Sequence, residues 1–393
     1  MTAETADIDA IRLQEIRESL PALARGVYGN TGTAGPVPIP AAEALSRAWS
    51  GQVASGRIGP GSWTVYREVR TAARVRLAAL LDSKPDRIAL THHTTEGLNI
   101  AALGLRWRPG DIVLSTDLEH LSVHAVLGAL RLRHGVEVRI VRLSGARTAE
   151  QAAQLLEAAM GTGVRAIFLS HVSYATGAVL PLNVISEMAH LWGAAVVVDG
   201  AQGVGALPVA PADLGADFYT VSGQKWLCGP EGTGALWVAP NWEERLQPGA
   251  VGPFGLAQAD PEGYWLPAPG AQRLEVGTTF GPAWEGFGAA LAWLDGIGWT
   301  GIWRRTHDLA EAARLQLGEI PGVEVLTPET HAGLVSFRVA NLQAERAVSL
   351  LAEAGFHVRS IPGWNAVRIA CGFFLEEAEI AAFSAAVAAL NRA

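Results

Sequence analysis

The chain is poor in cysteine, has no long apolar run and carries no excess of basic charge. Its 393 residues include two cysteines, Cys228 and Cys371. These are too few for a disulfide framework or a four-ligand zinc site, so we expect a cytoplasmic protein. No apolar stretch approaches the roughly 20 residues that cross a bilayer, and the charged stretch 1–20 predicts an amphipathic helix rather than a signal peptide; we expect no membrane partner. Acidic residues outnumber basic ones 38 to 30, which argues against nucleic acid as a partner.

Several catalytic signatures are also missing from the sequence. It has no GxSxG elbow and no GxxxxGK[ST] phosphate loop, and the glycines of 200–205 lack the GxGxxG spacing. His120 and His124 are four residues apart, but no third ligand and no HExxH motif accompany them, so we expect no metal. These absences argue against the common hydrolase, nucleotide-binding and metalloprotease classes.

The middle of the chain alternates apolar runs with helical stretches. Seven runs predict strands, at 88–90, 112–115, 136–143, 166–170, 194–199, 218–222 and 234–238. They lack strict polar alternation, as is typical of strands that helices cover on both faces. The pattern predicts an α/β fold with a seven-stranded, mostly parallel sheet between helices.

The two ends of the chain are expected to form a second unit. The stretch 241–283 is rich in proline and glycine and predicts a long functional loop. Helical patterns and short strands follow, which predict a smaller α+β domain. We therefore divide the chain into a large domain, 26–284, and a small domain made of 1–25 and 285–393.

The densest chemical signal lies between Ala195 and Val238. Asp199 ends an aliphatic strand and so lies at the carboxyl edge of the sheet, where α/β proteins bind ligands. Lys225 follows another strand in the turn SGQKW, where a lysine can serve as a Schiff-base nucleophile. A lysine paired with an acid that protonates a pyridine nitrogen is the arrangement of pyridoxal-phosphate enzymes. From spacing alone, a helix-capping Asp199 and a surface Lys225 explain the pattern equally well.

The residues around this pair carry a family resemblance. It is densest in VDGAQGVGALPVAPADLGADFYTVSGQKWLCGPEGTGALWV (198–238) and extends from YGNTGTAGPVP (28–38) to VRIACGFFLEEAEI (367–380). These stretches resemble class V aminotransferase-like enzymes of fold type I, which use pyridoxal 5'-phosphate (PLP). That family includes cysteine desulfurases, selenocysteine lyases, isopenicillin N epimerase and kynureninase. The resemblance implies a seven-stranded sheet, a smaller C-terminal domain and a homodimer with active sites at the interface.

The resemblance also implies roles for individual residues in the cofactor site. Lys225 would hold PLP covalently, Asp199 would keep its ring nitrogen protonated, and His120 would stack on the ring. The matching phosphate contacts are Thr94, Thr95, Ser222 and Gln224, with Thr278 from the partner subunit. Gln202 matches a contact to the phenolic oxygen of PLP. On local grounds the TTE at 94–96 is explained as well by a helix cap as by a phosphate site.

On the substrate side, Arg368 matches the arginine that clamps the substrate carboxylate. Its planar guanidinium suits two parallel hydrogen bonds, although a surface arginine on a strand is the alternative. We also assign Asn30, in the opening motif, and Tyr174, in HVSYATG, to substrate binding. Arg359 and Trp364 are expected to line the same pocket.

Two departures from the cysteine desulfurases bear on the reaction. The segment 356–370 is short and has no cysteine where desulfurases carry a nucleophilic one on a mobile loop, and Tyr174 stands where they have asparagine. We therefore predict carbon–sulfur β-elimination on cysteine or a cysteine derivative, without a protein persulfide. The alternatives are an epimerase like the isopenicillin N enzyme, an aminotransferase, or a non-catalytic accessory protein that keeps the fold. The substrate side chain stays open.

Overall fold

The computed structural model describes residues 8–59, 61–146 and 148–390. The N-terminal helix expected within residues 1–20 is present as α1 (Ala10–Glu18), and residues 1–7 of that stretch lie outside the described residues. None of the described helices is both long and apolar enough to cross a bilayer.

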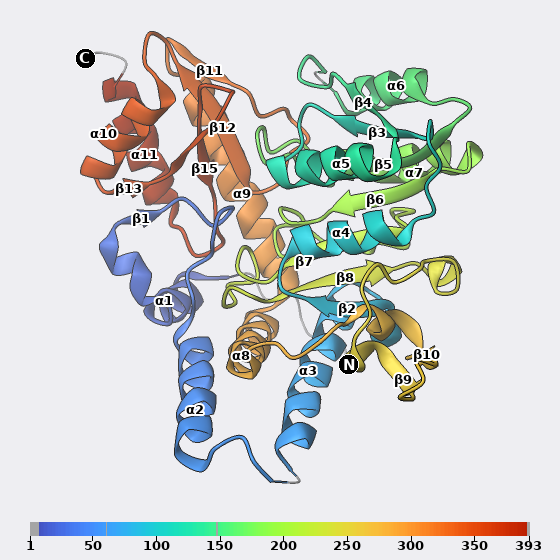
Figure 1. The fold of residues 1–393 in the computed structure, drawn as a ribbon. Coiled ribbons are helices and arrows are strands. Elements are labelled where there is room, and N and C mark those ends of the chain that lie inside the picture. Colours follow the sequence, from blue (N-terminus) through green and yellow to red (C-terminus); the bar gives the residue numbers. More distant parts are fainter. Residues whose placement is uncertain (1–7, 60, 147, 391–393) are drawn as a thin grey trace.

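A seven-stranded sheet forms the centre of the fold (Figure 1). In spatial order its strands are β2 (Ile88–Thr91), β8 (Gly234–Val238), β7 (Phe218–Ser222), β6 (Ala195–Asp199), β5 (Val164–Ser170), β3 (Ile112–Thr116) and β4 (Glu137–Val141). β8 is antiparallel to both of its neighbours, and the other neighbouring strands are parallel. The predicted α/β fold and all seven of its strands are confirmed.

Helices cover this sheet on both faces, which explains why its central strands are apolar along nearly their whole length. The helices that contact its strands are α3 (Ser62–Leu80), α4 (Thr94–Gly104), α5 (Leu121–His134), α6 (Ala149–Ala159) and α7 (Leu182–Leu191). α2 (Ile39–Ser55) packs on α8 (Gly281–Ile297), which packs on α3. α4 packs beside α5, and α6 beside α7. Right-handed crossovers place these two pairs on opposite faces, because the strand order reverses at β4.

A second sheet of four antiparallel strands lies to one side of the first (Figure 1). It consists of β11 (Val323–Val325), β12 (Leu334–Val339), β15 (Ala366–Ala370) and β14 (Arg359–Ile361), accompanied by α9 (Trp299–Gly318), α10 (Ala344–Glu353) and α11 (Glu377–Leu390). α1 joins this unit through Arg17, which donates to the Glu379 carboxylate at 2.9 Å. β1 (Val27–Tyr28), in the proposed large domain, pairs with β13 (Phe356–His357), in the proposed small domain. Because this pairing crosses the proposed boundary, the division at residue 26 stays a proposal.

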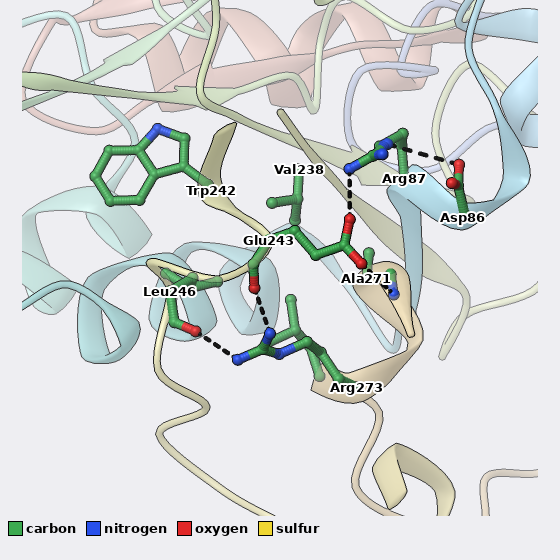
Figure 2. A pocket seen from close by; sticks show the side chains of 10 residues that line it. Asp86, Arg87, Val238, Trp242, Glu243, Leu246, Ala271 and Arg273 are labelled. Atoms are coloured by element: carbon green, nitrogen blue, oxygen red, sulfur yellow. Dashed lines mark hydrogen bonds and ion pairs between the residues drawn. The ribbon is translucent and has the colours of Figure 1, made fainter. Parts of the chain in front are cut away.

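The stretch 241–283 contains more regular structure than its composition predicts. It forms a hairpin, β9 (Leu256–Ala259) with β10 (Trp265–Pro267), between short 3-10 turns, and α8 already begins at Gly281. Figure 2 shows how the ends of this stretch are tied down: Arg273 donates to the carbonyls of Glu243 and Leu246, and Arg87 pairs with the Glu243 carboxylate at 2.9 Å. These ties fix the stretch to the β2 edge of the sheet.

Candidate active site

One pocket at the carboxyl edge of the central sheet gathers most of the predicted site residues. Its lining includes Thr94, Thr95, His120, Tyr174, Asp199, Gln202, Ser222, Gln224, Lys225 and Arg368. Asn30 lies outside this lining, and its side-chain oxygen accepts a hydrogen bond from Thr33 at 2.7 Å. Thr278 is exposed and also lies outside the pocket of its own chain. The structure thus brings together the residues that the sequence singled out, except Asn30, Thr278 and Trp364.

Lys225 and Asp199 meet in this pocket from neighbouring strands. Asp199 ends β6, and its carboxylate accepts a hydrogen bond from the Ala201 amide at 2.9 Å. Lys225 lies in the tight turn after β7, where glycine is required at Gly223 because a Cβ there would collide with Thr233. No described residue donates to or accepts from the Lys225 amine, which leaves it free for a ligand.

The electrostatic environment makes the Lys225 amine a usable base. Burial lowers its pKa to about 8, and the nearby negative charge of Asp199 opposes that shift. A fraction of the amine is therefore unprotonated at neutral pH, as a base or nucleophile requires.

Arg368 is buried in the pocket, and only one of its three guanidinium nitrogens has a hydrogen-bond partner among the described residues. Nη1 donates to the Tyr174 carbonyl at 2.7 Å, while Nε and Nη2 have no partner among the described residues. Burial lowers its pKa to about 9, and the positive charge of Arg359 adds to the shift. A Cβ at Gly32, which also lines the pocket, would lie 3.0 Å from Nη2. Glycine there keeps space open, and the unfilled donors suit a carboxylate.

His120 and Tyr174 form a ring pair in the same pocket. Their ring centroids are 5.0 Å apart at 87°, an edge-on contact. His120 caps α5, and its Nδ1 accepts from the Ser122 amide at 3.2 Å. Burial and the charge of Lys225 lower the pKa of His120, so this imidazole is neutral at neutral pH. The described residues contain no group of three side chains placed to hold a metal.

The other predicted cofactor contacts lie around the start of α4. Thr94 and Thr95 open this helix, whose unpaired N–H groups suit a phosphate. Ser222 donates to the Gln224 side chain at 2.8 Å, so both lie together at the end of β7. Gln202 is fixed at both ends of its amide group: it donates to the Gly32 carbonyl at 2.8 Å and accepts from the indole of Trp226 at 2.9 Å.

Sequence reasoning missed part of the pocket. Thr33, His93, Ser122 and Ser170 line it as well, together with Arg359, which the sequence did indicate. Glu119 lies behind Ser170 and is buried, although nothing in the sequence distinguishes it from a surface acid before a helix. Trp364 does not line the pocket, because it packs into an apolar cluster with Ala175.

The comparisons with known proteins identify the family. The model of the Aminotransferase class-V family matches residues 33–384, so the chain belongs to this family of PLP-dependent enzymes. It is 31% identical to a probable cysteine desulfurase of Methanothermobacter thermautotrophicus, over 89% of this chain and 87% of the relative. It is 34% identical to the isopenicillin N epimerase of Streptomyces clavuligerus, over 92% of this chain and 94% of the relative.

Two solved structures share the fold over nearly their whole length. One is a lysine-to-alanine mutant of C-DES with glycine covalently linked to its PLP cofactor, with a TM-score of 0.90, 29% identity and coverage of 95% of this chain and 98% of C-DES. The other is the cystine C–S lyase C-DES with its product cysteine persulfide, with a TM-score of 0.89, 30% identity and coverage of 94% and 99%. Fold type I and PLP as the cofactor are thereby shown.

The pocket fits this cofactor on its own geometry. It offers a buried amine without a partner at Lys225, a carboxylate at Asp199, and hydroxyls at the start of a helix in Thr94 and Thr95. An aldehyde, a ring nitrogen and a phosphate find matching groups there.

We predict that neither cysteine of the native protein reacts with a thiol reagent at mildly alkaline pH. Cys228 and Cys371 are both buried, and burial raises the pKa of each thiol to about 12. The thiolate fraction is therefore about 10³-fold smaller than for an ordinary cysteine. Titration with a chromogenic disulfide should detect no fast thiol in the native state and both thiols after unfolding. One fast thiol in the native state would show that a cysteine is accessible.

Proposed function

We propose that this enzyme catalyses β-elimination at a carbon–sulfur bond of cysteine or a cysteine derivative and releases the sulfur on a small molecule. The observation that carries the proposal is the pairing, in one pocket, of a single free amine at Lys225 with unfilled donors on Arg368. These two groups are what an α-amino acid needs in order to dock and lose its α-proton. We also expect a reducing compartment such as the cytoplasm, where the two unpaired thiols stay reduced.

Three pocket residues, Arg368, Lys225 and Asp199, have separate roles in the proposed reaction. Arg368 binds the substrate carboxylate with its guanidinium, and Lys225 removes the α-proton with its unprotonated amine. PLP, when bound, supplies the electron sink that stabilises the negative charge left at the α-carbon. Asp199 holds the proton on the ring nitrogen that this sink requires. The carbon–sulfur bond then breaks, sulfur leaves with the bonding electron pair, and water converts the three-carbon remainder into a keto acid and ammonia.

The acid–base groups of the pocket favour elimination over epimerisation. A sulfur leaving group departs readily as its anion because an ordinary thiol has a pKa of about 8.5, so elimination needs one base and no strong acid. An epimerase needs a second proton carrier on the opposite face of the substrate. His120 lines the pocket, but its lowered pKa leaves its protonated form sparsely populated at neutral pH, so it has little proton to deliver.

The second arginine indicates the kind of cysteine derivative. Arg359 lines the pocket, and its guanidinium makes a hydrogen bond of 3.2 Å to Thr33. Its charge acts on Lys225, His120 and Arg368, whose pKa values it helps to lower. A substrate with a second carboxylate would offset this excess of positive charge. Cystine has two carboxylates, and the similarity to the cystine C–S lyase C-DES supports the same substrate here.

The similarity to isopenicillin N epimerase keeps epimerisation as the second candidate. Transamination and a non-catalytic role are further outcomes of the test below.

We infer that a second copy of this chain completes the site through Thr278. Buried Glu275, which Arg70 and Arg74 bind at 2.5 and 2.6 Å, anchors the segment that presents Thr278. Beside it, Trp49 and Phe280 pack together with centroids 5.4 Å apart, although they are 45% and 51% exposed. Exposed aromatic side chains of this size are typical of a surface that another protein covers.

The homodimer should be detectable through the cofactor. Thr278→Ala is expected to weaken PLP binding by roughly 10-fold, because a charge-assisted hydrogen bond to phosphate is lost. Mixing this variant with Lys225→Ala protein, which retains Thr278, should restore one tight site per dimer in a fluorescence titration. A monomer in sedimentation analysis, or unchanged PLP affinity in the variant, would refute the shared site.

The reaction is tested by proton NMR of the PLP-loaded enzyme in heavy water with cystine, cysteine, S-substituted cysteines and amino acids without sulfur. We expect loss of the β-substituent and formation of a keto acid. Lys84 and Lys225 are the only lysines of the chain, which provides a matched pair: Lys225→Ala should abolish turnover, and Lys84→Ala, at an exposed position, should preserve it. Exchange of the α-proton with an intact skeleton would identify an epimerase or aminotransferase instead. No exchange with any substrate would favour the non-catalytic role.

Substrate docking is tested at Arg368. Arg368→Lys replaces the fork by one ammonium group and should weaken binding of the amino acid by roughly 10- to 100-fold, because one charged hydrogen bond is lost. Arg338→Lys is the control, since Arg338 lies on the neighbouring strand β12 and bonds to Glu324 and the Trp364 carbonyl outside the pocket. Spectral titration of the PLP-loaded proteins measures both affinities. Equal affinities in wild type and Arg368→Lys would place the carboxylate elsewhere.

A further inference from the structure

Glu119 is a buried acid next to the pocket that the mechanism above does not use. It follows β3 and is 3% exposed. Its two carboxyl oxygens have different partners: the Thr116 hydroxyl lies 2.6 Å from Oε1, and the Ser170 hydroxyl lies 2.5 Å from Oε2. Neither partner is a cation, so nothing in direct contact offsets a negative charge on this carboxyl.

The surroundings of Glu119 favour its neutral form. Burial raises its pKa to about 7, the hydrogen bonds from Ser170 and Thr116 oppose the shift, and the negative charge of Asp199 adds to it. Two ionisable side chains face it: Asp199 on β6, and Tyr174 in the loop after β5, whose pKa burial raises and the Glu119 charge raises further. Its chain neighbour His120 is turned into the pocket.

The hydrogen bonds fix where the proton of neutral Glu119 lies. The Thr116 hydroxyl oxygen accepts from the Leu118 amide at 3.1 Å, and among the described residues its hydrogen has no acceptor other than Oε1 of Glu119. The acid proton therefore lies on Oε2 and points at Ser170. The hydroxyl of Ser170 then accepts from Glu119 and must donate its own hydrogen elsewhere. When Glu119 is ionised, Ser170 donates to Oε2 and offers the pocket only a lone pair.

Ser170 lies beside Asp199, the acid proposed to keep the ring nitrogen of PLP protonated. It ends β5 and pairs in register with Asp199 at the end of β6. Side chains in register on parallel strands point to the same face of the sheet, and both residues line the pocket.

We propose that Glu119 is a positioning residue which, as the neutral acid, fixes the Ser170 hydroxyl as a donor at the Asp199 edge of the cofactor pocket. Ionisation of Glu119 reverses that donation, so that Ser170 presents a lone pair instead of a hydrogen to the Asp199 edge. The state of the ring nitrogen thus depends on a carboxyl that does not contact the cofactor. This inference rests on the proposed contact of Asp199 with the ring, and not on the lyase reaction.

The test follows two signals of the PLP-loaded enzyme in the absence of substrate. Infrared difference spectra between wild type and Glu119→Gln should show the carbonyl band of a protonated carboxylic acid, which disappears as the pH rises through about 7. The visible absorption of bound PLP should show a transition at the same pH. Glu119→Gln should lack that transition, because glutamine stays neutral and donates to Ser170 at every pH.

The Ser170→Ala variant distinguishes an effect of Glu119 that passes through the Ser170 hydroxyl from an effect of misfolding. The hydroxyl lowers the pKa of Glu119, so in this variant the infrared titration should persist at higher pH while the visible transition is lost. The proposal is overturned if wild type shows no acid band below pH 7, or if wild type and Glu119→Gln have the same visible titration. A visible transition retained in full by Ser170→Ala would also overturn it. Because no substrate is present, these results are independent of whether the enzyme is a lyase.

Discussion

The burial of two cations, Lys225 and Arg368, in one pocket with Asp199 is the constraint on which the rest of the site depends. Removing a charge from water costs several kcal/mol unless a partner replaces the lost hydration. Here the compensation is incomplete, as the lowered pKa values of both cations and the two unfilled donors of Arg368 show. The free energy of such a pocket falls when anions enter it, because they pair with its buried cations. The cofactor and a substrate carboxylate are such anions.

The fold supplies this pocket by ending three neighbouring strands in polar residues. β5, β6 and β7 are buried along nearly their whole length and end in Ser170, Asp199 and Ser222, each of which lines the pocket. The aliphatic residues before them hold the strands in the core between the helix layers. The last residue of each strand is therefore both rigidly held and open to the ligand, which is the condition for a preorganised site.

Most of the fold and the centre of the site could be predicted from the sequence because they depend on local patterns. Apolar runs predicted seven strands. The DGAQ and SGQK stretches singled out Asp199 and Lys225, but their spacing left a helix cap and a surface lysine as equal alternatives, and the family resemblance favoured the cofactor site. Glu119 could not be found, because its burial depends on β3 and β5 lying side by side. The role of Thr278 depends on a second chain and stays a prediction.

In the proposed reaction sulfur leaves on a small molecule and never on the protein. Intact-protein mass spectrometry after turnover of cystine by the PLP-loaded enzyme tests this claim most directly, because a persulfide adds the mass of one sulfur atom. We expect an unchanged protein mass while a keto acid and a small-molecule persulfide accumulate in solution. A gain of one sulfur atom, removed by a reducing agent, would contradict this claim, and so would cystine recovered unchanged.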